Sequence, residues 1–247
     1  MSPIEPFVVL LAAHLIGDFV LQTEQMALKK ARVLSWLMLH ATELGAITWV
    51  LCWTRAAWPV VVIVFLTHVV FDWVKPRMPG SVLLWYIVDQ AAHVLVLWLS
   101  AVWLTKNMDV YMTNMPLTQW VPYNFQVLFV AFLAVSRPVT IGMGLFLKPW
   151  HQEILQLKDV DPEHAPVTGL TRSGAWIGNL ERFFVVTCVL VGQPILVGFL
   201  LVAKGVMRFG ETSHLEHRKR GDYAIIGTVG SVWLAIAVGY LARYAMN

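Results

Sequence analysis

Three histidine–aspartate pairs stand four residues apart inside stretches of the sequence that are otherwise apolar. The pairs are His14 with Asp18, His68 with Asp72, and Asp89 with His93. A spacing of four residues places both side chains of a pair on one face of an α-helix. Imidazole and carboxylate groups together suit divalent ions such as Zn²⁺, Fe²⁺ and Mn²⁺. The spacing therefore predicts metal chemistry on the faces of apolar helices.

The predicted metal ligands exceed what one ion requires. They are His14, Asp18, His40, His68, Asp72, Asp89 and His93. Because a closed tetrahedral site takes about four ligands, either two ions bind or some of these groups act as partners of the ligands and as proton-transfer groups. We expect Zn²⁺ first, with Fe²⁺ or Mn²⁺ as alternatives. His40 and Asp89 are the candidate catalytic groups for proton transfer.

An aspartate inside a membrane helix is costly, by about 2.5–3.5 kcal/mol on insertion scales. A divalent cation would offset this cost, because it keeps the carboxylates ionised and the imidazoles neutral. For any single pair a plainer alternative exists, since a lone histidine in a membrane helix is more often a hydrogen-bond partner between helices. The repetition of the pattern over several apolar stretches favours a shared site.

The elements that must position these residues are long apolar helices. Of the 247 residues, 58% are hydrophobic and only 13% are charged, and the mean hydropathy is +0.65. Several apolar runs reach the roughly 18–20 residues that cross a bilayer. We therefore expect an all-α, polytopic transmembrane helical bundle with about six to seven membrane segments. The net charge of +3 is small, and no nucleic-acid partner is expected.

The apolar runs divide the chain into modules. Membrane spans are expected at about 6–25, 33–53, 57–75, 83–104, 125–147 and 223–241. The expected modules are a four-helix transmembrane module at 1–106, an extracytoplasmic loop at 107–124, the fifth span at 125–147, a cytoplasmic polar segment at 148–180 and a C-terminal membrane module at 181–247. The run after Glu181 is interrupted at Gly192–Pro194, where either a kinked span or a re-entrant hairpin is expected.

Basic residues between the spans predict an orientation. Lys29, Lys30 and Arg32 follow the first span, and Lys75 and Arg77 follow the third. The positive-inside rule then places these two loops in the cytoplasm and the N-terminus outside. In this orientation the histidines and aspartates fall in one layer, roughly 6–18 Å from the cytoplasmic ends of the first four spans.

Four basic residues in the second half are candidates for binding an anionic substrate. They are Arg137, Arg182, Lys204 and Arg208. Arg137 lies near the middle of the fifth expected span, where it would act as a catalytic anion clamp or as the counter-ion of a spare aspartate. The other three flank the interrupted run, where they could bind a lipid phosphate or simply follow the positive-inside rule.

Five sequence motifs are distributed over both halves of the chain. HLIGDFVLQT, HVVFDWVK and DQAAH lie in the N-terminal half, and GNLERFFVVTCVLVGQPILVGFLLVAKGVMRFGE and DYAIIGTVGS lie in the C-terminal half. Through these motifs the sequence resembles a bacterial membrane family catalogued as domain of unknown function 3307. The resemblance implies an integral protein of the bacterial inner membrane and implies no activity. The helical histidines and aspartates are also loosely similar, in architecture alone, to membrane-bound metal-dependent hydrolases.

The predicted function is an intramembrane metal-dependent enzyme, a hydrolase acting on a lipid or lipid-linked substrate. Its expected partners are membrane lipids and that substrate, and the oligomeric state stays open. The alternative is a membrane transporter or channel for a metal ion or protons, in which the same groups form a transit site. A third reading is a structural protein whose polar layer fixes the helix register.

Overall fold

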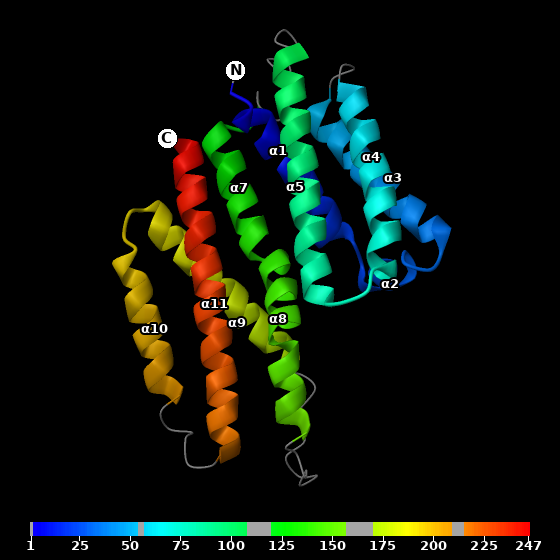
Figure 1. Ribbon diagram of the computed structural model, residues 1–247. Helices are drawn as coiled ribbons and strands as arrows, with labels where there is room; N and C mark the ends of the chain where they lie inside the picture. Colours follow the sequence, from blue (N-terminus) through cyan, green and yellow to red (C-terminus); the bar gives the residue numbers. More distant parts are fainter. Residues whose placement is uncertain (1, 54–56, 108–119, 157–169, 209–214) are drawn as a thin grey trace. The chain divides into compact units, whose positions relative to one another are not determined.

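The computed structural model describes residues 2–53, 57–107, 120–156, 170–208 and 215–247. Over these residues the regular structure is helical throughout, which confirms the predicted all-α class (Figure 1). They fall into two compact units, Met1–Leu133 and Ala134–Ala245. Six segments of the described chain are long and apolar enough to cross a membrane: Ile4–Leu21, Leu34–Cys52, Trp58–Arg77, Val82–Asn107, Tyr123–Glu153 and Gly221–Met246.

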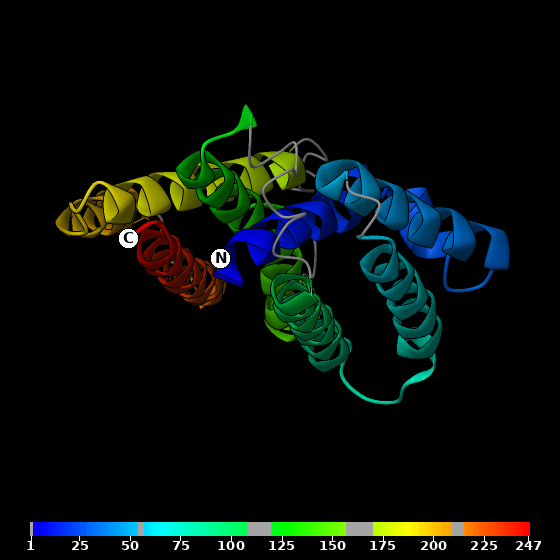
Figure 2. The same cartoon turned by 90° about the horizontal axis from the view of Figure 1, so that it is seen from above.

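The first unit is a bundle of long helices with short connections. Its elements are α1 (Ile4–Leu15), the π-helix η1 (Ile16–Leu21), α2 (Glu24–Lys29), α3 (Leu34–Cys52), α4 (Trp58–Val74), the 3₁₀ turn η3 (Lys75–Arg77), α5 (Val82–Asn107) and most of α7 (Tyr123–Val135). Four of them pack in a closed order, α1 on α3, α3 on α4, α4 on α5 and α5 on α1 (Figures 1 and 2). This ring brings the inner faces of four helices together.

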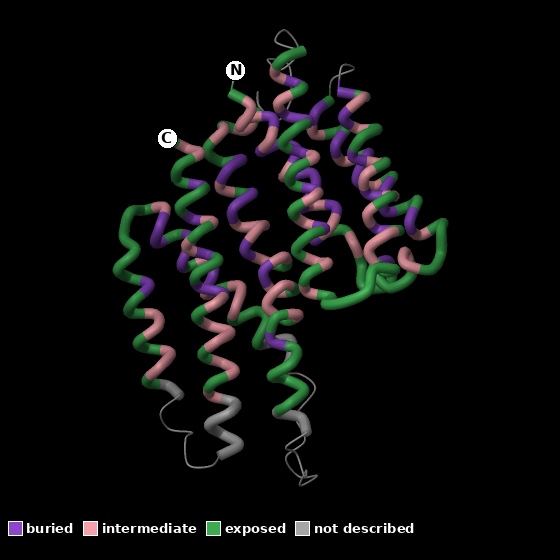
Figure 3. The backbone as a smooth tube through the Cα atoms, viewed as in Figure 1, coloured by how far each residue is buried: buried purple, intermediate pink, exposed green. Residues whose placement is uncertain are grey.

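The helices of this unit bury histidines and aspartates and expose large apolar side chains. On α4, Leu66 and Val70 are 52% and 51% exposed, whereas His68 and Asp72 are 1% and 6% exposed. Figure 3 shows the same alternation of exposed and buried turns along the other helices of the unit. Buried charges and exposed large apolar side chains together are informative in a way that scattered surface leucines are not. The pattern is typical of helices whose outer surface faces lipid.

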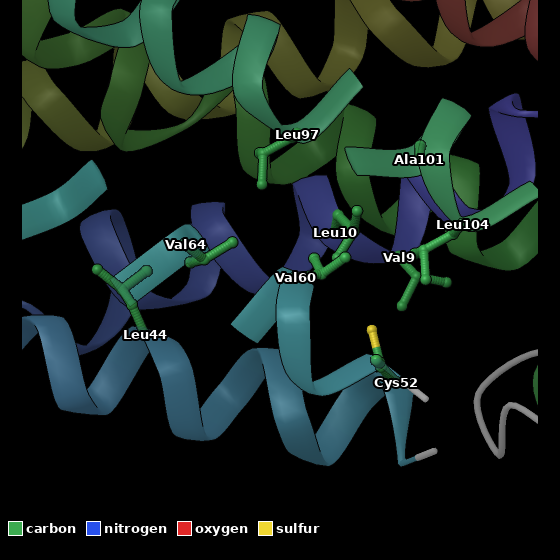
Figure 4. Close-up of a cluster of buried hydrophobic side chains, with 10 residues drawn as sticks. Val9, Leu10, Leu44, Cys52, Val60, Val64, Leu97, Ala101 and Leu104 are labelled. Atoms are coloured by element: carbon green, nitrogen blue, oxygen red, sulfur yellow. The ribbon is translucent and has the colours of Figure 1, made fainter. Parts of the chain in front are cut away.

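An apolar layer lies directly against the histidines. On each of the four helices a buried aliphatic residue stands four positions from a histidine: Leu10 from His14, Leu44 from His40, Val64 from His68 and Leu97 from His93. These four residues belong to one core cluster that also includes Val9, Cys52, Val60, Ala101 and Leu104 (Figure 4). A spacing of four residues is about one helical turn, so the core cluster fixes the depth and rotation of each histidine.

The second unit contains most of the remaining helices. They are α8 (Arg137–Gln156), α9 (Leu170–Leu190), α10 (Ile195–Arg208) and α11 (Leu215–Met246). The span expected at 125–147 is interrupted at Ser136, between α7 and α8. Pro138 explains the interruption, because proline has no N–H to donate to the preceding turn and its ring crowds that turn. The polar segment expected at 148–180 is partly helical, since α8 extends to Gln156 and α9 begins at Leu170.

The helical run after Glu181 is broken near Gly192–Pro194, as the glycine and the proline predicted. Helix α9 ends at Leu190 and α10 begins at Ile195, and Gly192 between them has a φ of +76°. Glycine adopts this left-handed conformation without steric cost. Helices α9 and α10 pack on one another as a hairpin (Figure 1). The apolar part of α10, Ile195–Val206, is shorter than the six span-length segments.

A close approach of η1 to α3 depends on Gly17. A Cβ atom at this position would lie 2.7 Å from Leu44 Cγ, and the Leu44 side chain is fully buried and has no room to withdraw. We expect Gly17→Ala to lower the free energy of unfolding by about 1–3 kcal/mol, because overpacking forces neighbouring side chains off their rotamers. The measurement is the unfolding midpoint of the purified protein in detergent.

Gly45→Ala is the matched control for this prediction. A Cβ atom at Gly45 would meet its nearest neighbour, Val61 Cγ1, at 3.7 Å, an ordinary contact. Replacing a helical glycine with alanine at such a site stabilises the helix by up to about 1 kcal/mol. Equal effects of the two substitutions would contradict the close approach at Gly17.

Candidate functional site

The structure places every candidate ligand of the first unit in one buried cluster. The members are His14 on α1, Asp18 on η1, His40 on α3, His68 and Asp72 on α4, and Asp89 and His93 on α5. The four histidines are at most 2% exposed. Buried groups of this kind are expected to have polar partners, since an unpaired polar atom away from water is costly. The contacts inside the cluster therefore decide what it can do.

Three of the histidines converge on one point. His14, His68 and His93 each offer a ring nitrogen, and these nitrogens lie within 4.8 Å of one another. The rings of His68 and His93 are stacked, with centroids 4.0 Å apart and planes inclined by 22°. Because two imidazolium rings would repel each other at this distance, the stacking favours neutral imidazoles. A triad of neutral imidazoles is a set of nitrogen ligands that a divalent ion can accept.

Asp18 lies beside this triad. Its Oδ1 atom is 3.1 Å from His40 Nε2 and 3.7 Å from His68 Nε2, and its Oδ2 atom is 3.9 Å from His14 Nε2. In a tetrahedral zinc site with bonds of about 2.0–2.1 Å, neighbouring ligand atoms are about 3.3 Å apart. The separations of Asp18 Oδ1 from His40 Nε2 and His68 Nε2 are thus near that of ligands around a common ion, whereas the contact with His14 Nε2 is longer.

The hydrogen bond of His68 shows which of its two ring nitrogens carries the lone pair. His68 Nδ1 lies 2.8 Å from the Val64 carbonyl oxygen, and because a carbonyl oxygen only accepts, Nδ1 carries the proton. In the neutral ring, Nε2 is then an acceptor that faces another acceptor, Asp18 Oδ1. Neither of these atoms has a hydrogen-bond partner among the described residues. Two lone pairs aimed at the same space are repulsive unless a positive charge lies between them.

His14 has a similar arrangement. Its Nε2 atom lies 3.3 Å from Gln90 Oε1, an acceptor, so Nε2 donates and Nδ1 holds the lone pair. Nδ1 is buried and has no hydrogen-bond partner within the described part of the chain. Gln90 in turn donates from Nε2 to Asp89 Oδ2, at 3.2 Å. The amide therefore orients His14 in the way that outer partners orient metal-binding histidines.

Two lysines neutralise the outer aspartates. Lys30 Nζ lies 2.8 Å from Asp72 Oδ2, and Lys75 Nζ lies 2.7 Å from Asp89 Oδ2. The sequence pattern indicated both lysines as loop charge that orients the spans, and it did not predict these two partners. For Lys75 a signal existed, because it follows Asp72 by three residues near the end of the same helical run.

The position of Lys30 depends on a tight local fold. The chain leaves η1 at Leu21, and the short helix α2 begins after Thr23, whose Oγ1 accepts the Met26 N–H. This cap is the usual way to start a helix. Lys30 follows the end of α2, and its ammonium returns to Gln22 Oε1 at 2.5 Å. No sequence pattern predicted these contacts of Lys30, because they depend on a turn rather than on helical spacing.

The four basic candidates all belong to the second unit. Arg182 is 4% exposed, and it donates to the Val135 carbonyl, to Thr140 Oγ1 at 2.6 Å and to Asn179 Oδ1 at 2.6 Å. These contacts brace the interruption between α7 and α8. Lys204 pairs with Glu181 at 2.6 Å, linking α10 to α9. Arg137 is exposed at the first residue of α8, and Arg208 ends α10 with its side chain outside the described part of the structure.

Comparison with known proteins gives a family and no activity. Residues 7–119 match the family model described as a protein of unknown function, DUF3307. No curated protein and no solved structure matches the chain. The matched stretch contains all the histidines and aspartates of the cluster, and it ends before the C-terminal motifs begin. The part of this chain that holds the buried cluster is thus the part that is similar to the DUF3307 family.

Proposed function

We propose that the first unit is an intramembrane metal-dependent enzyme, a hydrolase that acts on a lipid or lipid-linked substrate. The observation that supports it best is the lone pair of His68 Nε2 facing Asp18 Oδ1 in a fully buried setting. A cation near these atoms would relieve the repulsion, and the ring nitrogens of His14, His68 and His93 would hold it. The alternative, a second proton on His68, is disfavoured by the stacked ring of His93.

The donor set suits a borderline divalent ion. Imidazole nitrogens with a carboxylate oxygen match Zn²⁺, with Fe²⁺ or Mn²⁺ as alternatives. If the three ring nitrogens alone hold the ion, a fourth position beside Asp18 is left for water or substrate, and such an open position distinguishes catalytic from structural sites. Such an ion would supply Lewis acidity, lowering the pKa of water and polarising an ester oxygen.

The chain's own groups then handle the proton. Asp18 and His40 form the one close carboxylate–imidazole pair that lies beside the triad, at 3.1 Å. Their separation lets Asp18 accept a proton from water and pass it to His40 Nε2. Asp72 and Asp89 are instead paired with lysines, so Asp18 and His40 are the proton-transfer groups that we propose.

The expected substrate is an amphiphile because of where the cluster lies. The helices that supply it are of span length, and their outer faces expose large apolar side chains such as Leu66 and Val70. A group that reaches the cluster from such surroundings must travel with a hydrocarbon portion. Membrane lipids are therefore the partners that we propose.

We propose the bacterial inner membrane as the location, with the N-terminus outside and the α2 and η3 connections in the cytoplasm. Lys29, Arg32 and Arg77 supply positive charge to these connections, together with the paired lysines. Single cysteines at exposed Lys29 and Trp120 should be labelled from opposite sides of the membrane. Labelling of both from one side would contradict this orientation.

The function is tested by turnover of a panel of phospholipid and lipid-phosphate substrates in detergent and in liposomes. We expect hydrolysis that a chelator abolishes, that added Zn²⁺ restores, and that Asp18→Asn lowers by about 10²-fold or more, the usual contribution of proton transfer. Asn keeps the shape of the side chain and removes its basicity. Zn²⁺ or proton flux into liposomes without any lipid turnover would instead favour the transporter.

A further inference from the structure

A second set of metal-type donors lies next to the histidine triad. His40 Nε2 is 3.1 Å from Asp18 Oδ1 and 3.6 Å from Asp72 Oδ2. His40 is fully buried, and neither of its ring nitrogens has a hydrogen-bond partner among the described residues. The imidazole is thus in contact with two carboxylates without donating to either. With the proton on Nδ1, His40 Nε2 and the two carboxylate oxygens would be three lone-pair groups that one cation could satisfy together.

A positive charge is bound to one of these donors, Asp72, and it belongs to Lys30. The ammonium lies 2.8 Å from Asp72 Oδ2 and 2.5 Å from Gln22 Oε1, and the side chain is only 13% exposed. The Lys30 ammonium is thus in contact with two oxygen atoms, which are also the kind of ligand that a metal cation would bind. In two-metal hydrolases the ions lie about 3.5–4 Å apart and share bridging carboxylates. Asp18 has this bridging position, because its oxygens contact His14, His40 and His68.

Lys75 offers an internal comparison. Its ammonium also binds an aspartate, Asp89, but the side chain is 31% exposed and lies over the ring of Tyr86. Among the described residues, the imidazole in contact with Asp89 is that of His93, which already belongs to the triad. The Lys75 pair therefore neutralises charge, whereas the Lys30 pair completes a separate donor set.

We propose that a second divalent-cation position, formed by His40, Asp18 and Asp72, lies beside the histidine triad and that the Lys30 ammonium fills it. The protein then holds one exchangeable ion at the triad and one permanent positive charge next to it. This deepens the proposed function, on which it rests for the identity of the first ion. The permanent charge would stabilise an anionic oxygen of the substrate without requiring a second metal.

The experiment counts zinc ions per chain by elemental analysis after equilibration with Zn²⁺ and removal of free ion. The wild type is expected to hold one ion, and Lys30→Met is expected to hold one more than the wild type. Methionine keeps an unbranched side chain only one atom shorter than that of lysine and removes the charge. The double variant Lys30→Met/Asp72→Asn should return to the wild-type count, because it removes the carboxylate as well.

Lys29→Met is the positional control. Lys29 is the preceding residue, exposed on α2 with its ammonium over the Trp36 ring, and its loss should leave the count unchanged. If Lys30→Met does not fold, titration of the wild type still decides, because a second tight ion there would overturn the proposal.

The two proposals fail in different ways. Equal counts in the wild type and Lys30→Met overturn the second position and leave the proposed enzyme intact. A wild type without metal overturns the metal centre, and a gain of one ion in Lys30→Met would still support the second position.

Discussion

Replacing His68 with alanine is expected to remove the tightly held divalent ion from the purified protein. His68 is the residue whose geometry is most constrained, because Val64 fixes its proton on Nδ1 and leaves Nε2 aimed at Asp18. Changes to groups that only orient metal ligands lower affinity by about 10–100-fold, so removal of a ligand itself should cost at least about 100-fold. The measurement is zinc content after dialysis, together with the dissociation constant from competition with a chelator.

Val64→Ala is the matched control for His68→Ala. Val64 lies one turn earlier on α4, is 1% exposed and belongs to the core cluster, so its truncation also creates a cavity. Its carbonyl remains, and the hydrogen bond to His68 remains with it. We expect Val64→Ala to lose stability and keep the ion. If both variants lose metal equally, loose packing would explain the loss and the ligand role of His68 would be contradicted.

The regular part of the cluster could be predicted from helical spacing alone. The pairs His14–Asp18, His68–Asp72 and Asp89–His93 share helix faces because four residues make about one turn. Apolar residues another turn away, such as Leu10 and Leu97, mark the same inward faces. Counting residues from the cytoplasmic ends of the expected spans then placed the histidines and aspartates of four helices at one depth. Helical periodicity is enough to predict these inward-facing residues, because the inner faces of a membrane bundle must hold the polar groups.

The departures from regularity were not predictable from that spacing. Asp18 lies in the π-helix η1, which widens the turn and separates its carboxylate from His14 by 3.9 Å. A π-helix is a local insertion often found at functional sites, and the sequence has no simple pattern for it. Gly17 alone hints at it, because only glycine permits the approach to Leu44.

Contacts between residues far apart in the sequence were also not predicted. Lys30 lies 42 positions before its partner Asp72, and Arg182 lies 47 positions after the carbonyl that it binds. Single positive charges near helix ends match the positive-inside pattern equally well, so the sequence could not separate the two roles. The distinction depends on where the turn after η1 and the interruption at Ser136 lie relative to their distant partners, which helical spacing does not give.

Replacing Lys75 with methionine is expected to destabilise the first unit substantially. The Asp89 side chain is 7% exposed, and Lys75 supplies its shortest cationic contact, at 2.7 Å. Breaking a buried ion pair by removing one partner costs about 3–5 kcal/mol, because the remaining charge is uncompensated. Since Lys75 itself is 31% exposed and partly screened by solvent, we expect about 2–3 kcal/mol. The measurement is denaturant unfolding in detergent.

The double variant Lys75→Met/Asp89→Asn separates loss of charge balance from loss of packing. Removing both charges leaves no isolated carboxylate, so its stability should return close to that of the wild type. Asp89→Asn alone should cost less than Lys75→Met, because the freed lysine can extend toward water whereas the freed carboxylate cannot. Lys106→Met, exposed in the last turn of α5, is the control and should change little. A double variant as unstable as Lys75→Met would mean that the lysine stem, rather than its charge, supports Asp89.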